Sequence, residues 1–310
     1  MPTPPEPPTP PEPPDSFEHG FAHVNGVRLH YVSSGSGDPL VLLPGWPRTW
    51  WQYRTMLPLL ARHFRVIVCE YRGMGESEKP ASGYDKATMA RDMHELVRHL
   101  GYRRVNLAGE DVGSWIAYFF AAHYPQSTAR LAIWEPGAPT SALGDLPALP
   151  APDGLNAWHL GFNQLDGLPE RLLAGRYRTV VDWSADQLAV SPKSIDEHSR
   201  EIYARAYDSA DAIRAVAGWY RTLREDLRVA AGFPRLTMPV LVPGGRYLAL
   251  SRASNEHLAT DIRFVEIPDA GHYLSEEQPQ LLSRELISFF EGRAAASPSS
   301  PPSHPTTATA

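Results

Sequence analysis

A Gly-x-Asp-x-Gly stretch in the first half of the chain most constrains the fold. A short apolar segment from Val105 leads into Gly109, Asp111 and Gly113, and the apolar run 115–122 follows. This order predicts a strand, a sharp turn and a helix. A side chain at either glycine would clash with the strand or with the first helical turn. The turn therefore presents the Asp111 carboxylate at the amino end of a helix, where the helix dipole favours its ionised form.

Taken alone, this spacing is equally consistent with a turn whose Asp caps the helix. The surrounding pattern decides between the two, because buried strands and helices alternate along the chain. An Asn25-Gly26 turn predicts a hairpin within residues 19–33. Further strands are predicted at 39–43, 65–70, 129–134, 238–242 and 262–267, and helices at 51–60, 88–100, 251–259 and 280–290. We therefore expect an α/β fold with a mostly parallel central sheet flanked by helices.

The alternation stops between the sixth and seventh strands. Residues 137–155 are rich in Pro, Gly and Ala, and residues 158–227 have helical periodicity without a buried strand. We expect a helical cap at 137–232, inserted after the sixth strand into a core of residues 17–136 and 233–293. The Pro-rich segment 1–16 and the segment 294–310 are expected to be disordered tails.

Composition excludes several classes of protein. The 310-residue chain is 43% hydrophobic and 21% charged, with a net charge of −6 and scattered Lys and Arg residues, so we set nucleic-acid binding aside. The single cysteine, Cys69, lies in a predicted buried strand and forms no disulfide within the chain. No apolar run reaches membrane-spanning length, and the amino terminus does not resemble a secretory signal. The expected location is cytoplasmic.

Three further groups fit a site around Asp111. His272 lies in a loop after the last predicted strand, which completes the chain order of an α/β-hydrolase. The turn after strand 238–242 has no carboxylate, so we assign the acid to Glu135, directly after strand 129–134. The open alternatives for the acid are Asp145, Asp153 and Asp269. By position, the backbone N–H groups of Trp46 and Val112 would form an oxyanion hole.

An Asp in place of the usual Ser decides the chemistry. A carboxylate nucleophile displaces a leaving group at a saturated carbon and forms an alkyl ester of the enzyme, which water then hydrolyses. The leaving group is a halide or the oxygen of an epoxide. Val112 follows the nucleophile where haloalkane dehalogenases have Trp and fluoroacetate dehalogenase has Arg, and Trp115 stands where a further Arg would be needed. These residues favour the epoxide.

The chain resembles the α/β-hydrolase-fold epoxide hydrolases, most closely the Cif-type bacterial enzymes. Residues 158–162, Trp-His-Leu-Gly-Phe, are similar to a Trp-His-Phe-x-Phe stretch of that subfamily, and residues 203–207 and 219–221 are similar to its helix pair ending in Tyr-Tyr-Arg. The resemblance implies an epoxide hydrolase without cofactor or metal, in which His159 and Tyr220 assist ring opening. It also places Glu135 at the position of the charge-relay acid. We place the following residues in the substrate pocket: Trp158, Phe162, Tyr203, Tyr207 and Trp115.

Two departures from that family keep alternatives open. The family usually has His-Gly where this chain has Pro44-Gly45, and His where it has Glu110. A second carboxylate at Glu110 would raise the pKa of Asp111 unless its side chain points away. The alternative functions are a haloalkane or haloacetate dehalogenase and a non-catalytic binder of small molecules. The aromatic cap favours an apolar epoxide, and self-association as a homodimer stays open.

Overall fold

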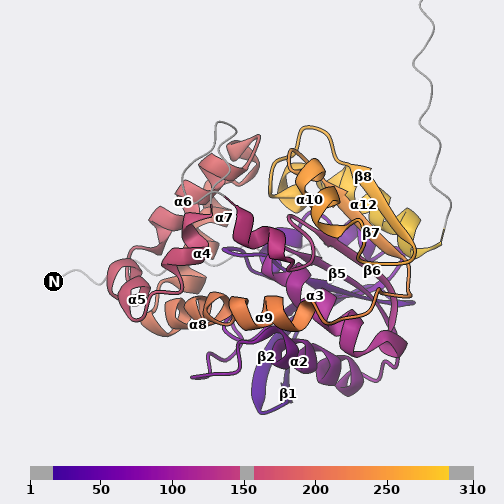
Figure 1. Ribbon diagram of the computed structural model, residues 1–310, viewed down its shortest axis with the longest axis horizontal. Coiled ribbons are helices and arrows are strands. Elements are labelled where there is room, and N and C mark those ends of the chain that lie inside the picture. The colour runs from indigo at the N-terminus through magenta and orange to yellow at the C-terminus, as the bar shows by residue number, and fades with distance from the viewer. Residues whose placement is uncertain (1–16, 147–156, 293–310) are drawn as a thin grey trace, which may run out of the picture.

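The structure, a computed structural model, describes residues 17–146 and 157–292. Its centre is one eight-stranded sheet with the order β1-β2-β4-β3-β5-β6-β7-β8 (Figure 1). The pairs β1–β2 and β2–β4 are antiparallel. All the other neighbouring strands are parallel, as the alternating pattern predicts. The strands are β1 (Glu18–Val24), β2 (Val27–Ser34), β3 (Pro39–Leu43), β4 (Arg65–Glu70), β5 (Val105–Glu110), β6 (Thr128–Trp134), β7 (Val240–Gly244) and β8 (Ile262–Glu266). The predicted tails, 1–16 and 294–310, lie outside the described residues.

The β1–β2 hairpin confirms the prediction from Asn25-Gly26. Val24 pairs with Val27, so the loop has two residues, and both have positive φ values of 47° and 72°. Such a turn twists in the same sense as the flanking strands, and Asn and Gly tolerate these angles best. The hairpin forms one edge of the sheet.

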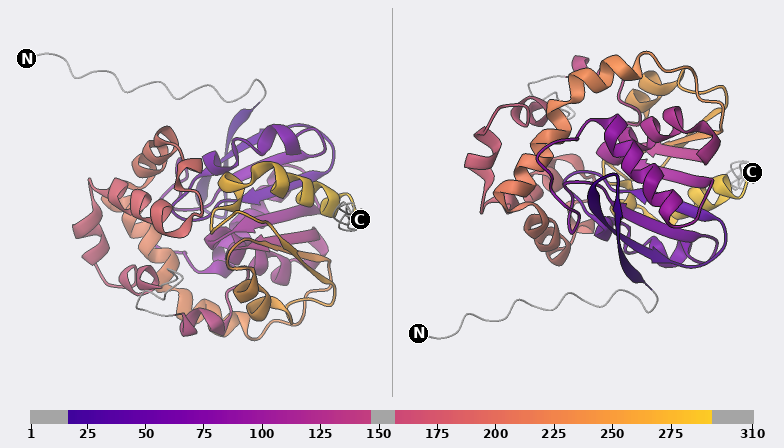
Figure 2. Two further views of the ribbon diagram at one scale, coloured as in Figure 1. Left: turned by 90° about the horizontal axis from the view of Figure 1, so that it is seen from above. Right: turned by 90° about the horizontal axis from the view of Figure 1, so that it is seen from below.

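Two hydrophobic layers cover the sheet because successive side chains of a strand point to opposite faces. In β3, Leu40 and Leu42 pack into one layer, whereas Val41 and Leu43 pack into the other. The first layer is closed by α1 (Leu57–Leu60), α11 (Leu274–Glu277) and α12 (Pro279–Phe290). The second layer is closed by α2 (Lys86–His99) and α3 (Val112–His123) (Figure 2). The helix α10 (Leu248–Asn255) packs against β7 and β8.

The helices between β6 and β7 gather at one end of the sheet, away from the end of α12 (Figure 2). They are η3 (Ser141–Asp145), α4 (Trp158–Phe162), α5 (Leu168–Leu173), α6 (Tyr177–Leu188), η4 (Pro192–Ser194), α7 (Glu197–Tyr207), α8 (Ala210–Arg221) and α9 (Leu223–Ala230). They form the helical cap expected after the sixth strand, while its predicted limits at residues 137 and 232 stay predictions. None of the helices in the described ranges is long and apolar enough to cross a membrane.

The segment predicted as one helix from residue 51 to residue 60 is two short pieces. A 3-10 turn, η1 (Trp50–Tyr53), is followed by the single turn of α1. Pro58 explains the break, since proline has no N–H for a bond to the preceding turn and is tolerated only in the first turn of a helix. The loop between β3 and α1 thereby stays close to the carboxyl end of the sheet.

Candidate active site

Asp111 occupies the sharp turn between β5 and α3 that the sequence predicts. Its backbone has φ 53° and ψ −124°, an uncommon conformation for a residue with a side chain. A Cβ added to Gly109 would approach the Gly113 carbonyl oxygen to 2.4 Å, and one added to Gly113 would approach the Leu43 oxygen to 2.3 Å. Both contacts are impossibly close. The two glycines are therefore required by the crowding of the turn.

The two carboxylate oxygens of Asp111 have different surroundings. Oδ1 accepts hydrogen bonds from the backbone N–H of Val112 at 2.5 Å and of Trp46 at 3.1 Å, the two groups expected to form an oxyanion hole. The loop carrying Trp46 comes this close because Gly45 has no side chain, since an added Cβ would lie 2.8 Å from the Asp111 Cβ. Oδ2 receives neither N–H group. It lies 3.3 Å from Nε2 of His272.

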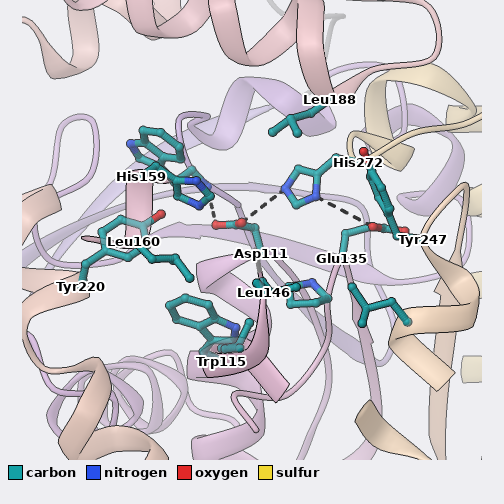
Figure 3. A pocket seen from close by; sticks show the side chains of 14 residues that line it. Asp111, Trp115, Glu135, Leu146, His159, Leu160, Leu188, Tyr220, Tyr247 and His272 are labelled. Atoms are coloured by element: carbon teal, nitrogen blue, oxygen red, sulfur yellow. Dashed lines mark hydrogen bonds and ion pairs between the residues drawn. The ribbon is translucent and has the colours of Figure 1, made fainter. Parts of the chain in front are cut away.

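His272 lies between two carboxylates. Its other ring nitrogen, Nδ1, is 3.8 Å from Oε2 of Glu135 (Figure 3). The backbone N–H of His272 donates to the Leu188 carbonyl at 2.9 Å, which fixes the loop against the cap. Burial disfavours the imidazolium, but the interactions with Asp111 and Glu135 outweigh burial and raise the pKa of His272 well above its usual value.

Glu135 is the described carboxylate that faces Nδ1 of His272. It follows β6 with a positive φ of 49°, is buried, and accepts a hydrogen bond from the Gly245 N–H at 3.1 Å. Burial raises the pKa of Glu135, while His272 and the Gly245 N–H oppose this rise. Of the alternatives, Asp269 is exposed, and the side chain of Asp145 and all of Asp153 lie outside the described part of the chain.

The cap places two polar rings opposite Asp111, His159 on α4 and Tyr220 on α8. His159 stacks on Trp46 with ring centres 5.5 Å apart and meets the ring of Tyr220 edge-on at 6.0 Å. Burial lowers the pKa of His159 to about 4 although Asp111 opposes this effect, so its imidazole is neutral at pH 7. Burial raises the pKa of Tyr220 well above its usual value. Two neutral hydrogen-bond donors therefore face the carboxylate.

The Tyr220 hydroxyl has no hydrogen-bond partner within the described residues, although it is buried. Figure 3 shows it pointing toward the Asp111 carboxylate across the pocket. Edge contacts of its ring with Trp46 and Trp115, at 6.0 and 6.1 Å, fix that direction. A buried hydroxyl without a partner is costly, so a ligand oxygen at this point would gain a full hydrogen bond.

Most of the pocket wall is apolar. The lining residues are Trp46, Asp111, Trp115, Glu135, Pro136, Leu143, Leu146, His159, Leu160, Leu188, Tyr220, Tyr247, Leu250 and His272. Trp115 lies where the sequence places it. Trp158 and Phe162 do not line this pocket, which corrects that expectation: Trp158 is 37% exposed and packs on Phe162 and Trp183 at the outside of α4.

Tyr203 and Tyr207 also lie outside the pocket wall, contrary to expectation. The Tyr203 hydroxyl donates to Oε1 of Glu276 at 2.7 Å, and the Tyr207 hydroxyl donates to the Arg48 carbonyl oxygen. The guanidinium of Arg48 lies over the ring of Tyr203 and forms a buried ion pair with Glu276 at 2.7 Å. The inner face of α7 thus joins the cap to the core instead of contacting the ligand space.

Sequence reasoning missed Tyr247 and the leucines of the pocket wall. Tyr247 stands in the turn after β7, where the sequence has no carboxylate. Its position at the carboxyl end of a strand was a usable signal, because functional side chains collect at that edge of a parallel sheet. Four of the five leucines lie on cap segments, where helical periodicity does not reveal which face turns toward the pocket, and Leu250 lies on α10.

Glu110 places no second charge beside Asp111. Its side chain turns away from Asp111, and its Oε2 accepts hydrogen bonds from Nε2 of Gln52 at 2.6 Å and from the Ser275 hydroxyl at 2.8 Å. Burial raises the pKa of Glu110 to about 8, although the charge of His272 opposes the rise. Its carboxyl group is therefore largely neutral at pH 7. Gln52 also accepts from the Gly45 N–H at 2.9 Å, which ties Glu110 to the loop carrying Trp46.

Fold and site together define an α/β-hydrolase with an aspartate at the nucleophile position. Residues 38–188 match the family model described as the alpha/beta hydrolase fold. The chain is 36% identical over 285 residues to the soluble epoxide hydrolase of Corynebacterium sp. strain C12, covering 88% of this chain and 96% of that protein. The chain belongs to the epoxide hydrolases of the α/β-hydrolase fold family.

Solved structures resemble the chain over the same extent. Cfl2 from Burkholderia cenocepacia is 37% identical, with a TM-score of 0.82 over 89% of this chain and 96% of that one. The Cif epoxide hydrolase from Acinetobacter nosocomialis also has a TM-score of 0.82, over 89% of both chains. Its identity is 21%, so this second likeness is one of fold alone.

Proposed function

We propose that the protein converts an epoxide to a vicinal diol in two steps, through an alkyl ester on Asp111. The observation that carries this proposal is that the two oxygens of the Asp111 carboxylate have different partners. Oδ1 is held by the N–H groups of Trp46 and Val112, while Oδ2 is next to His272 on the pocket wall. Family membership and a neutral donor pair opposite Asp111 support the same chemistry.

In the first step, Oδ2 of Asp111 attacks a ring carbon of the epoxide. The new C–O bond forms as the ring C–O bond breaks, and the electron pair of the broken bond goes to the epoxide oxygen. The Tyr220 hydroxyl and a ring N–H of His159 donate hydrogen bonds to that oxygen, and Tyr220 transfers its proton to the developing alkoxide. A neutral phenol suffices as the acid because an alkoxide is far more basic. The product is a hydroxyalkyl ester of Asp111.

Formation of the ester changes the state of His272. The free Asp111 carboxylate helps to raise the pKa of His272, and the ester carries no charge. The pKa of His272 therefore falls, and its imidazolium releases a proton, which balances the proton taken from Tyr220. Neutral His272, with Nδ1 oriented by Glu135, becomes a general base only after the alkylation step.

In the second step, His272 removes a proton from water, and the oxygen of that water adds to Cγ of Asp111. Negative charge develops on Oδ1, where the N–H groups of Trp46 and Val112 stabilise it. The intermediate collapses by breaking the Cγ–Oδ2 bond, and His272 returns its proton to the departing oxygen. The diol leaves with Oδ2, and the water oxygen stays on Cγ. The proton that this oxygen still carries passes to His272, which restores the Asp111 carboxylate and the imidazolium.

One observation favours a dehalogenase as the second candidate. The indole N–H of Trp115 is buried on the pocket wall without a partner among the described residues, and such a donor could hydrogen-bond a departing halide. The experiment below separates this function, and a non-catalytic binder, from an epoxide hydrolase.

The test is mass spectrometry of unmodified protein, His272→Gln and Asp111→Ser after exposure to styrene oxide and 1,2-epoxyhexane. We expect His272→Gln to retain an adduct of the epoxide mass on the peptide containing Asp111, because its ester is not hydrolysed. Asp111→Ser should retain none. Asp269→Asn, which changes an exposed carboxylate near His272, should form diol at the unmodified rate.

Other outcomes would overturn the proposal. An adduct from 1-bromohexane or haloacetate, with none from either epoxide, would select the dehalogenase. Recovery of every compound unaltered from a tight complex with unmodified protein would select the binder.

A further inference from the structure

Two buried hydrogen-bond donors on the pocket wall have no part in the chemistry above. They are the Tyr247 hydroxyl and the Trp115 indole N–H, and neither has a partner among the described residues. The two residues are 7% and 2% exposed. A polar group buried without a hydrogen bond costs about 1–3 kcal/mol. Such groups are rare in proteins, and each one requires an explanation.

The two donors lie on different sides of Asp111. Tyr247 stands in the turn after β7, beside His272 and Glu135, on the side of Asp111 away from Tyr220 (Figure 3). Trp115 is on α3, and its ring meets that of Tyr220 edge-on at 6.1 Å. A substituent of an epoxide bound between Tyr220 and Asp111 would therefore extend past one of the unpaired donors.

Most of the other described residues of the wall offer these donors no side-chain acceptor. Around them lie Pro136 and five leucines, at positions 143, 146, 160, 188 and 250. Among its described residues the wall has no Lys or Arg, whereas the carboxylates of Asp111 and Glu135 are both present. A negatively charged substrate would be repelled without compensation. The group that fits is a neutral oxygen acceptor within an otherwise apolar substituent.

We infer that the substrate is an epoxide whose apolar substituent carries a neutral hydrogen-bond acceptor, such as an ether, ester or ketone oxygen. Tyr247 receives this oxygen and is a specificity-determining residue, and Trp115 is the second donor available to it. This inference rests on the proposed function and narrows the class of epoxide. A simple hydrocarbon epoxide would leave both donors unpaired in the complex.

The experiment compares two epoxides that differ in one atom. Phenyl glycidyl ether and 4-phenyl-1,2-epoxybutane have the same size, but an ether oxygen in the first is a CH₂ group in the second. Each kcat/KM is divided by the uncatalysed hydrolysis rate of the same epoxide, which removes the intrinsic effect of the oxygen. We expect the unmodified protein to prefer the ether by about 10-fold or more, the equivalent of one buried hydrogen bond.

Variants then show which residue causes the preference for the ether. Tyr247→Phe should bring the ratio close to one by lowering the value for the ether more than the value for the CH₂ compound, and Trp115→Phe should lower the ratio less. Tyr118→Phe, a change on α3 outside the pocket wall, should leave the ratio unchanged. Thermal unfolding, followed by circular dichroism, tests that each variant is folded.

The outcomes separate this inference from the proposed function. A ratio near one in the unmodified protein, or a preference that both Tyr247→Phe and Trp115→Phe retain, overturns the inference and leaves epoxide hydrolysis intact. Absence of diol from both compounds, together with absence of an adduct on His272→Gln, overturns both.

Discussion

The core side and the cap side of the pocket differ in how their polar groups are paired. On the core side, Asp111, His272 and Glu135 form a chain of paired charges, and two N–H groups occupy Oδ1. On the cap side, His159 and Tyr220 are neutral, and the Tyr220 hydroxyl is unpaired within the described residues. The core side is therefore organised without a ligand. On the cap side, His159 and Tyr220 can still donate hydrogen bonds to a ligand, and an epoxide oxygen would accept them.

The largest expected effect is on the core side. Asp111→Asn removes the proposed nucleophile, so we expect kcat/KM for diol formation to fall by at least about 10⁴-fold, as for other covalent catalysts that lose this group. Diol formation from styrene oxide, followed by chromatography, measures the loss. Activity within tenfold of the unmodified protein would exclude Asp111 as the nucleophile.

The same variant tests the coupling between the charges. The asparagine side chain is uncharged like the ester, so the pKa of His272 should be lower in Asp111→Asn than in the unmodified protein. NMR titration of the His272 ring gives both values. An unchanged pKa would show that Asp111 is not what raises it.

Breaking the second link should affect only the later step. Glu135→Gln keeps the shape of the side chain but removes the charge that orients His272, so ester hydrolysis should slow by about 10²–10⁴-fold. Formation of the ester should change by less than about threefold. Rapid-quench mass spectrometry of the Asp111 peptide resolves the two steps, and equal slowing of both would contradict the assigned role.

On the cap side the pattern should reverse. Tyr220→Phe removes one donor to the epoxide oxygen and leaves His159 in place, so the alkylation rate should fall by about 10²-fold. Hydrolysis of ester already formed should not change, because Tyr220 has no part in it. The same rapid-quench measurement applies, with Tyr118→Phe as the control. A slower hydrolysis step would show that Tyr220 acts in ester hydrolysis, which contradicts its assigned role in alkylation alone.

The smallest effect on activity is expected at Glu110, behind the nucleophile. Burial raises its folded pKa to about 8, so between about pH 4.5 and 8 the folded state holds a proton that the unfolded state has lost. Glu110 therefore destabilises the fold increasingly as pH rises through this window. Glu110→Gln cannot ionise, and its stability relative to unmodified protein should rise by about 1 kcal/mol per pH unit there and level off above.

Urea unfolding between pH 5 and 9 measures this difference, while kcat/KM at pH 7 should stay within about threefold because the amide oxygen still accepts from Gln52 and Ser275. A stability difference that does not vary with pH would mean that Glu110 is ionised throughout.

The sequence predicted what depends on short stretches of chain. The turn at Asp111, the Asn25-Gly26 hairpin and the alternation of strands and helices follow from local patterns. The position of Glu135 directly after a parallel strand predicted that it lies near His272. The pocket wall depends on which way each cap helix is rotated, and periodicity cannot supply that information. Tyr203 and Tyr207 were therefore misplaced, while Tyr247, on a turn without periodicity, was missed.

Because the two Asp111 oxygens have different surroundings, only one of them should exchange with water during catalysis. If the ester forms through Oδ2, the first diol made by each molecule in water enriched in oxygen-18 carries an ordinary oxygen from the protein, and the heavy oxygen enters Asp111. Oδ1, held by the N–H groups of Trp46 and Val112, is never exchanged. By this mechanism the oxygen at the Oδ2 position is replaced by one from water in every catalytic cycle, while Oδ1, bonded to the same carbon, is the oxygen incorporated when the protein was synthesised.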